Sequence, residues 1–171
     1  MTTTARLVLS DCEGVLASIK EDMRSELWRP RWAGLVALLR AVGHVLDKVD
    51  GAHSPEAGQV IADAWSDLKK SKPEPRIFWQ FIEEERNNVL KTYEFGPAMN
   101  ITIRPGTAHL NLATGDTYSS PSGPTTFDAF MRSGGFEGQD PLALCRDAIE
   151  FWRDHLDKID RQIANRAART D

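Results

Sequence analysis

The sequence predicts an α+β fold that is predominantly α-helical: a bundle of about five helices, with a small two- or three-stranded antiparallel β-meander between the last two. Five segments repeat apolar residues at three- and four-residue steps, the period of a helix with one buried face. One segment at about 97–120 alternates apolar and polar residues instead, which is the period of a strand. With 171 residues, of which 41% are hydrophobic and 27% charged, the chain is expected to form a single domain, 1–171, carrying the meander as an insertion.

The five helices are predicted at residues 5–23, 26–49, 55–70, 76–93 and 140–167. Two of them open with a capping residue followed by proline, Ser54-Pro55 and Asp140-Pro141. Such a side chain accepts a first-turn N–H, and proline fits the first helical position because its missing N–H is not needed there. The second and fourth segments are the richest in Trp, Phe and Leu, so we expect these two helices to pack against each other.

The strand signal consists of two alternating runs, at 99–103 and 108–112. Residues 104–107 (Arg-Pro-Gly-Thr) between them have the proline and glycine of a type II turn. A third short strand is expected at 117–119, followed by a loop at 119–125 that is rich in Ser, Gly and Pro.

Charge and cysteine content favour a cytoplasmic protein that does not bind nucleic acid non-specifically. The net charge is −4, which gives no large basic field. Cys12 and Cys145 are the only cysteines, and both fall on predicted apolar helix faces. We therefore expect free buried thiols in a reducing compartment.

The sequence carries no motif for a membrane span, a cofactor or a metal. The longest apolar stretch, 32–49, is interrupted by Arg40, His44 and Asp47, so it is not expected to cross a membrane. No phosphate-binding loop, dinucleotide fingerprint or nucleophile elbow occurs. None of the four histidines has a second ligand at a spacing typical of a metal site.

Two stretches, LRAVGHVLDKVDG at 39–51 and FWQFIEEERNNVLKTYEFG at 78–96, resemble a family of small uncharacterised bacterial helical proteins. A weaker similarity is to HEPN-type helical domains, many of which are metal-independent RNases with an Arg and a His on one helix. Arg40 and His44 match that pair with three intervening residues, where the family usually has four to six. The resemblance implies an alternative function, an RNase with a nucleic-acid partner, in which His44 is the general acid or base and Arg40 stabilises the phosphoryl oxyanion.

Polar residues also interrupt the apolar face of the fourth predicted helix. At 100° per residue, Glu85 lies at the centre of that face, with Arg86 and Asn88 toward its margins. A buried carboxylate must be paired or have a raised pKa. Two interpretations stay open. Glu85 has a structural role, in an ion pair with an arginine or as a cap for a neighbouring helix, or Glu85, Arg86 and Asn88 line a polar binding pocket shared with the second helix.

The function that the sequence favours is a non-enzymatic helical interaction module that self-associates or binds another protein. No complete catalytic constellation is present. The second helix is apolar on one side and carries Ala33, Ala37 and Ala41 toward the other, which permits close approach of another helix. A short strand pair also leaves an edge that a partner can cover. We therefore expect a homodimer.

Overall fold

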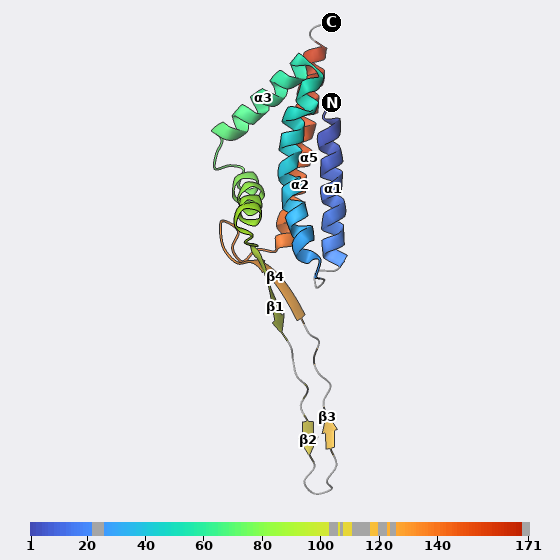
Figure 1. The fold of residues 1–171 in the computed structure, drawn as a ribbon, viewed down its shortest axis with the longest axis vertical. Coiled ribbons are helices and arrows are strands. Elements are labelled where there is room, and N and C mark those ends of the chain that lie inside the picture. The colour runs from blue at the N-terminus through green and yellow to red at the C-terminus, as the bar shows by residue number, and fades with distance from the viewer. Residues whose placement is uncertain are drawn as a thin grey trace.

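The computed structural model describes residues 1–21, 26–102, 106, 108–110, 117–119, 123 and 126–168. Helices and antiparallel strands confirm the predicted fold class. Four of the helices are α1 (Thr3–Glu21), α2 (Trp28–Lys48), α3 (Pro55–Lys70) and α5 (Pro141–Ala167), and a 3₁₀ turn at Asp50–His53 lies between α2 and α3. Helices α1, α2 and α5 run side by side, whereas α3 leans away from them at an angle (Figure 1).

Both predicted cap-and-proline starts are confirmed. Ser54 Oγ accepts the backbone N–H of Ala57 at 3.1 Å, and Asp140 Oδ1 accepts the backbone N–H of Leu142 at 2.8 Å. These bonds satisfy N–H groups that have no partner within the helix, which is why α3 and α5 begin where the sequence predicts.

The start of α1 is held by side chains that lie far away in the sequence. The carboxylate of Asp50 is buried and accepts the backbone N–H groups of Thr4 and Ala5 at 3.0 and 2.9 Å. Asp160 of α5 accepts the backbone N–H of Thr2 at 2.8 Å. Negative charge at a helix N-terminus is favourable, so these carboxylates stabilise α1 and also join it to the rest of the fold.

The predicted helix at 76–93 is a continuous helical run, but most of it is not α-helical. Short α4 (Glu84–Asn87) lies between two π-helical segments, Ile77–Glu83 and Asn88–Thr92. A π-helix bonds residues five apart, so its side chains do not follow the 100° step that the sequence prediction assumed. π-Helical turns are rare and frequently occur at functional sites.

The predicted packing of the second and fourth helices is confirmed. Trp32 of α2 meets Phe81 edge to face, with 6.2 Å between the ring centroids. Leu39 of α2 and Ile82 of the fourth helix are both fully buried. The remaining faces of α2 contact α1, α3 and α5, and Ala37 is half-buried there. Ala33, Ala37 and Ala41 are all half-buried, so this side of α2 lies only partly against the other helices, and the dimer stays a prediction.

The strands are antiparallel but do not form a meander. Strand β1 (Pro97–Thr102) pairs with β4 (Thr126–Met131), and β2 (Ala108–Leu110) pairs with β3 (Thr117–Ser119). In a meander, β1 would pair with the next strand along the chain. The paired region also extends beyond the predicted 97–120, because strand β4 was not predicted. The type II turn expected at 104–107 lies outside the described residues, apart from its glycine.

We call these four strands the arm. Strands β1 and β4 leave one end of the helices, and the β2–β3 pair lies farther out along the same direction (Figure 1). The base of the arm is anchored: the backbone N–H of Arg132 donates to the carbonyl oxygen of Gly96, and that of Met131 donates to the carbonyl oxygen of Gln139, both at 2.9 Å. Beyond its base the arm leaves the helical body.

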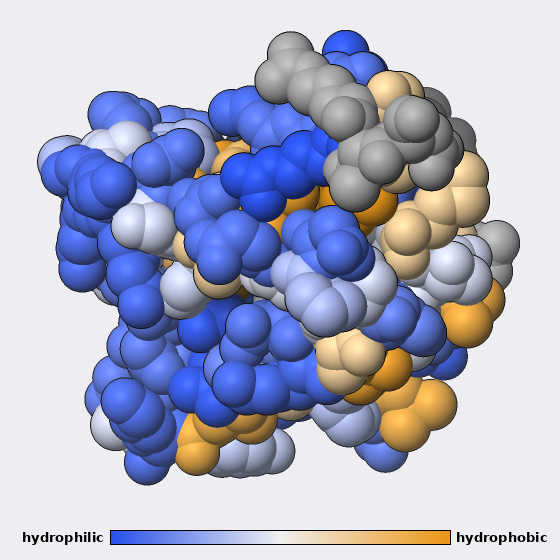
Figure 2. Space-filling model, turned by 90° about the horizontal axis from the view of Figure 1, so that it is seen from above, coloured by the Kyte–Doolittle hydropathy of each residue, from blue (hydrophilic) through white to orange (hydrophobic). Residues whose placement is uncertain are grey.

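Seen from above, the opposite end of the molecule is largely hydrophilic, with apolar residues in small separate areas (Figure 2). This is the expected surface for amphipathic helices that bury their apolar faces. Among the described residues, no helix has both the length and the apolar character needed to cross a membrane.

Candidate functional site

A hollow of about 250 Å³ lies where α2, α3 and α5 meet, and we call it the Arg40 pocket. Arg40 and His44 of α2 both line it, so the two residues of the RNase alternative do reach one concave site. Trp65 of α3, and Trp152 and His155 of α5, form its other walls.

Arg40 is half-buried and lies against aromatic rings. Its guanidinium carbon is 5.6 Å from the ring centroid of Trp65 and 5.8 Å from that of Phe78. Burial lowers the pKa of Arg40, Glu83 opposes that shift, and Arg86 adds to it. A guanidinium keeps its charge under such perturbation. In the part of the chain that the structure describes, Arg40 forms no ion pair with a carboxylate.

The two histidines approach the pocket from different helices. His44 is exposed, and its pKa is lowered by burial first and then by the positive charges of Arg40 and Arg86. His155 is half-buried and stacks on Phe151 with 5.7 Å between centroids. Burial lowers the pKa of His155 to about 4. Both shifts favour the uncharged imidazole, which has one N–H donor and one acceptor nitrogen.

Gly43 sets how closely α5 approaches α2 in this pocket. A Cβ at position 43 would lie 2.8 Å from Cη2 of Trp152 and 3.5 Å from Nη1 of Arg40. The indole nitrogen of Trp152 is buried and has no hydrogen-bond partner among the described residues. No pattern in the sequence assigns Trp152 or His155 to a site, because only the crossing of α2, α3 and α5 brings them to Arg40.

The three residues of the polar pocket predicted on the fourth helix, Glu85, Arg86 and Asn88, differ in burial. Glu85 is 4% exposed, and its Oε1 accepts the indole N–H of Trp32 at 2.8 Å and the backbone N–H of Gly96 at 2.9 Å. Burial raises the pKa of Glu85, while these two hydrogen bonds and the charge of Arg132 act in the opposite direction. Glu85 thereby connects α2 to the residue that precedes β1.

Arg86 and Asn88 do not join Glu85. Arg86 is half-buried and donates to Asn87 Oδ1 at 2.9 Å, and Asn88 is exposed. The π-helical turn that begins at Asn88 changes the angular step on which the predicted pocket depended. Of the three residues, only Glu85 takes the central buried position.

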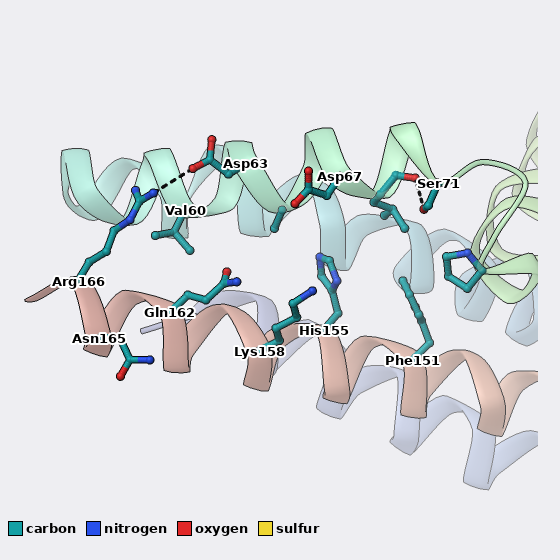
Figure 3. Close-up of a pocket in the computed structure, with 13 residues that line it drawn as sticks. Val60, Asp63, Asp67, Ser71, Phe151, His155, Lys158, Gln162, Asn165 and Arg166 are labelled. Carbon is teal, nitrogen blue, oxygen red and sulfur yellow. Dashed lines mark hydrogen bonds and ion pairs between the residues drawn. The ribbon is translucent and has the colours of Figure 1, made fainter.

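A larger and more open groove of about 570 Å³ lies between α3 and α5 (Figure 3). Asp63 and Asp67 come from the α3 wall, and Lys158 and Arg166 come from the α5 wall. Asp63 and Arg166 form an ion pair across it at 3.1 Å. His155 lines both this groove and the Arg40 pocket. Because the groove carries charges of both signs, it does not select an anion or a cation.

Metal and thiol chemistry find no support in the described residues. No group of three or more His, Cys, Asp or Glu side chains there is placed to hold a metal ion. Cys12 and Cys145 are buried and free, as the sequence predicts, and burial raises the pKa of both thiols, that of Cys12 to about 12. Both sulfurs are therefore protonated at neutral pH.

Comparison with known proteins gives no match. No protein-family model matches the chain, and neither a curated protein nor a solved structure does. The resemblances drawn from the sequence stay predictions, and the function is inferred from the geometry of the described residues.

Proposed function

We propose that this protein is a non-enzymatic interaction module that self-associates through the arm. One observation supports this most: the described strands of the arm form two-stranded pairs, and they leave the helical body instead of packing along it (Figure 1).

A two-stranded ribbon is marginally stable alone, because it buries little surface on either face. Strand β1 has β4 on one side, and neither strand has a further strand partner among the described residues. Each outer edge thus presents backbone N–H and C=O groups that another strand can bind. A second copy of the chain supplies the same ribbon and can pair with it about a two-fold axis.

The register of the ribbon is consistent with this use. Beyond the base of the arm, apolar pairs alternate with polar pairs along β1 and β4. Side chains alternate between the two faces of a ribbon, so the Met99–Ala129 pair faces one side and the Asn100–Asp128 pair faces the other. In order outward, the pairs are Met99–Ala129, Asn100–Asp128, Ile101–Phe127 and Thr102–Thr126.

The test measures the mass in solution and then shortens the arm. Thr102 and Thr126 are register partners, so a two-residue Asn-Gly turn can replace residues 103–125 and still close the β1–β4 hairpin. By light scattering at micromolar concentration, the full chain should have twice its 19.1 kDa, which is 38.2 kDa. The shortened protein should be a monomer. A full chain of 19.1 kDa, or a shortened protein that still dimerises, would contradict the proposal.

A second candidate function is metal-independent RNA cleavage at the Arg40 pocket. It is supported by the common pocket of Arg40 and His44, with uncharged His155 as a further group that can move a proton. The test is cleavage of single-stranded RNA in the presence of a chelator. Arg40→Ala and His44→Ala should each reduce the rate by about a hundredfold or more. Cleavage that survives both substitutions would come from another site or a contaminant.

A further inference from the structure

We infer that the Arg40 pocket binds a phosphate ion or the phosphate group of a small monoester. The inference is independent of self-association through the arm, and it does not require that RNA is cleaved. It rests on three features: a half-buried guanidinium without a carboxylate partner in the described chain, donors from two helices, and a locally positive charge in a protein of net charge −4.

The first feature is the environment of the guanidinium. Trp65 and Phe78 lie 5.6 and 5.8 Å from its central carbon and provide ring carbons, not oxygen acceptors. Arg40 has no ion pair with any carboxylate of the described residues, so its N–H groups are available to a ligand. A guanidinium can place two parallel N–H donors on two oxygens of a phosphate.

The second feature is the charge around the pocket. Arg40 and Lys48 line it, and Arg86 is close enough to act electrostatically on Arg40. Two carboxylates oppose these three cations: Asp47, which is ion-paired with Lys48 at 2.8 Å, and Glu83, which acts on Arg40 from outside the pocket. The cations exceed the anions here although acidic side chains exceed basic ones over the whole chain, which favours an anionic ligand at this position.

The third feature is the set of uncharged donors. His44 from α2 and His155 from α5 line the pocket, and each offers an N–H group. Donors that come from two helices suit the four oxygens of a tetrahedral phosphate better than the two oxygens of a planar carboxylate. A volume of about 250 Å³ lies below the range for drug-sized ligands, so an ion or a small ester fits.

The first experiment uses the unmodified protein. Inorganic phosphate is titrated into ¹⁵N-labelled protein at constant ionic strength, with chloride as the balancing anion. The indole N–H signals of Trp65 and Trp152 should shift and then saturate, whereas that of Trp28 at the base of the arm should not. Absence of a saturable shift at the two pocket tryptophans, or equal shifts at all three, would overturn the inference.

The second experiment compares Arg40→Met with a matched control, Lys69→Met. Lys69 is exposed and its Nζ lies 5.2 Å from the ring centroid of Trp65, but it does not line the pocket. By titration calorimetry, Arg40→Met should weaken phosphate binding about tenfold or more, and Lys69→Met by less than about twofold. If Arg40→Met is unfolded by circular dichroism, His155→Gln takes its place, with a loss of about threefold or more expected. Equal affinity in the pocket variant and the control would contradict the assignment.

Methyl phosphate and acetate, titrated in parallel, identify the ligand further. Tighter binding of methyl phosphate assigns the pocket to a monoester, and tighter binding of inorganic phosphate assigns it to the free ion. Acetate that binds as tightly as both would refute a phosphate site.

Discussion

Glu85→Ala is the substitution whose consequences follow most directly from the structure. The side chain is buried, and one carboxylate oxygen accepts two hydrogen bonds, from the indole of Trp32 and from the backbone of Gly96. Alanine removes the acceptor and leaves both donors without a partner at the junction between the helices and the arm. A Cβ on Gly96 would lie 2.5 Å from the second carboxylate oxygen, so the two positions are in direct contact.

The size of the effect can be worked from these contacts. An unsatisfied buried donor costs about 1–3 kcal/mol, which applies to the buried indole N–H of Trp32, and the part-buried N–H of Gly96 adds a smaller cost. Removing Glu85 also relieves the desolvation of its carboxylate, which is the first cause of its raised pKa. We therefore expect a net loss of about 1–3 kcal/mol for Glu85→Ala. Glu85→Gln keeps an oxygen acceptor without the charge and should lose less than about 1 kcal/mol.

The assay is chemical denaturation followed by circular dichroism, with two neighbours as controls. Glu84 is exposed, so Glu84→Ala should stay within about 0.5 kcal/mol of the unmodified protein. Arg86 is half-buried with a single hydrogen bond to its neighbour Asn87, and Arg86→Ala should cost about 1 kcal/mol. Equal unfolding free energies for Glu85→Ala and Glu84→Ala would refute the assignment of Glu85 as the buried connection.

The pH dependence of Glu85 gives an independent check. A raised folded-state pKa means that the folded protein favours the protonated carboxyl. The stability from this preference is complete below the unfolded pKa, ordinarily 4.5, and is lost as pH rises through the folded pKa. The unmodified protein should therefore gain stability relative to Glu85→Gln as pH falls from 7 toward 4.5. A difference between the two proteins that does not change with pH would contradict the direction of the shift.

Three further predictions concern the core, the start of α1 and α5. Leu39→Ala and Ile82→Ala remove fully buried side chains from the contact of α2 with the fourth helix. Each substitution should lower the free energy of unfolding by about 2–5 kcal/mol in chemical denaturation. Losses below about 0.5 kcal/mol for both would contradict that packing. Asp50→Ala removes the acceptor of two N–H groups at the start of α1 and should cost about 2–4 kcal/mol. Asp50→Asn keeps one oxygen acceptor and should cost about half as much. Equal losses for the two variants would argue against the bidentate cap. The pKa of His155 is about 4 in the folded protein and ordinarily 6.5, so the unfolded chain takes up the proton first as pH falls. The free energy of unfolding should therefore fall by at most about 3 kcal/mol between pH 6.5 and pH 4. His155→Gln should reduce that slope in pH-dependent unfolding; a slope identical to that of the unmodified protein would refute the role of burial.

Local signals in the sequence were sufficient to predict most of the helices. Ser54-Pro55 and Asp140-Pro141 combine a side-chain acceptor with a residue that lacks the N–H, and both starts are confirmed within one residue. The period of the apolar residues predicted which faces of α2 and α5 are buried. Such signals depend only on neighbours in the chain, so no tertiary information was needed.

The strand order and the π-helical turns depend on more than local signals. Strand β4 has alternating Phe127, Ala129 and Met131, but its partner β1 lies more than twenty positions earlier, and the intervening Ser-, Gly- and Pro-rich residues favoured a loop. A helical period read at 100° per residue does not distinguish α from π turns, so Asn88 was predicted at the margin of the buried face and is exposed instead.

The candidate site was predicted only in part. Arg40 and His44 are four positions apart on one helix, so their common face follows from the sequence. His155 and Trp152 reach the same pocket only because α5 crosses α2, and no pattern within α5 indicates this. The cap that Asp50 provides to α1 likewise depends on the turn that follows α2.

Contact between the arms of two copies can be measured directly by photo-crosslinking. A benzophenone amino acid is placed at Asn100, an exposed position of β1, and in a separate protein at Lys70, an exposed position at the end of α3. After irradiation at micromolar concentration and denaturing electrophoresis, the Asn100 protein should give a covalent dimer near 38.2 kDa, twice 19.1 kDa, and the Lys70 protein should remain at 19.1 kDa. A crosslinked dimer from Lys70 alone, or none from either position, would contradict self-association through the arm.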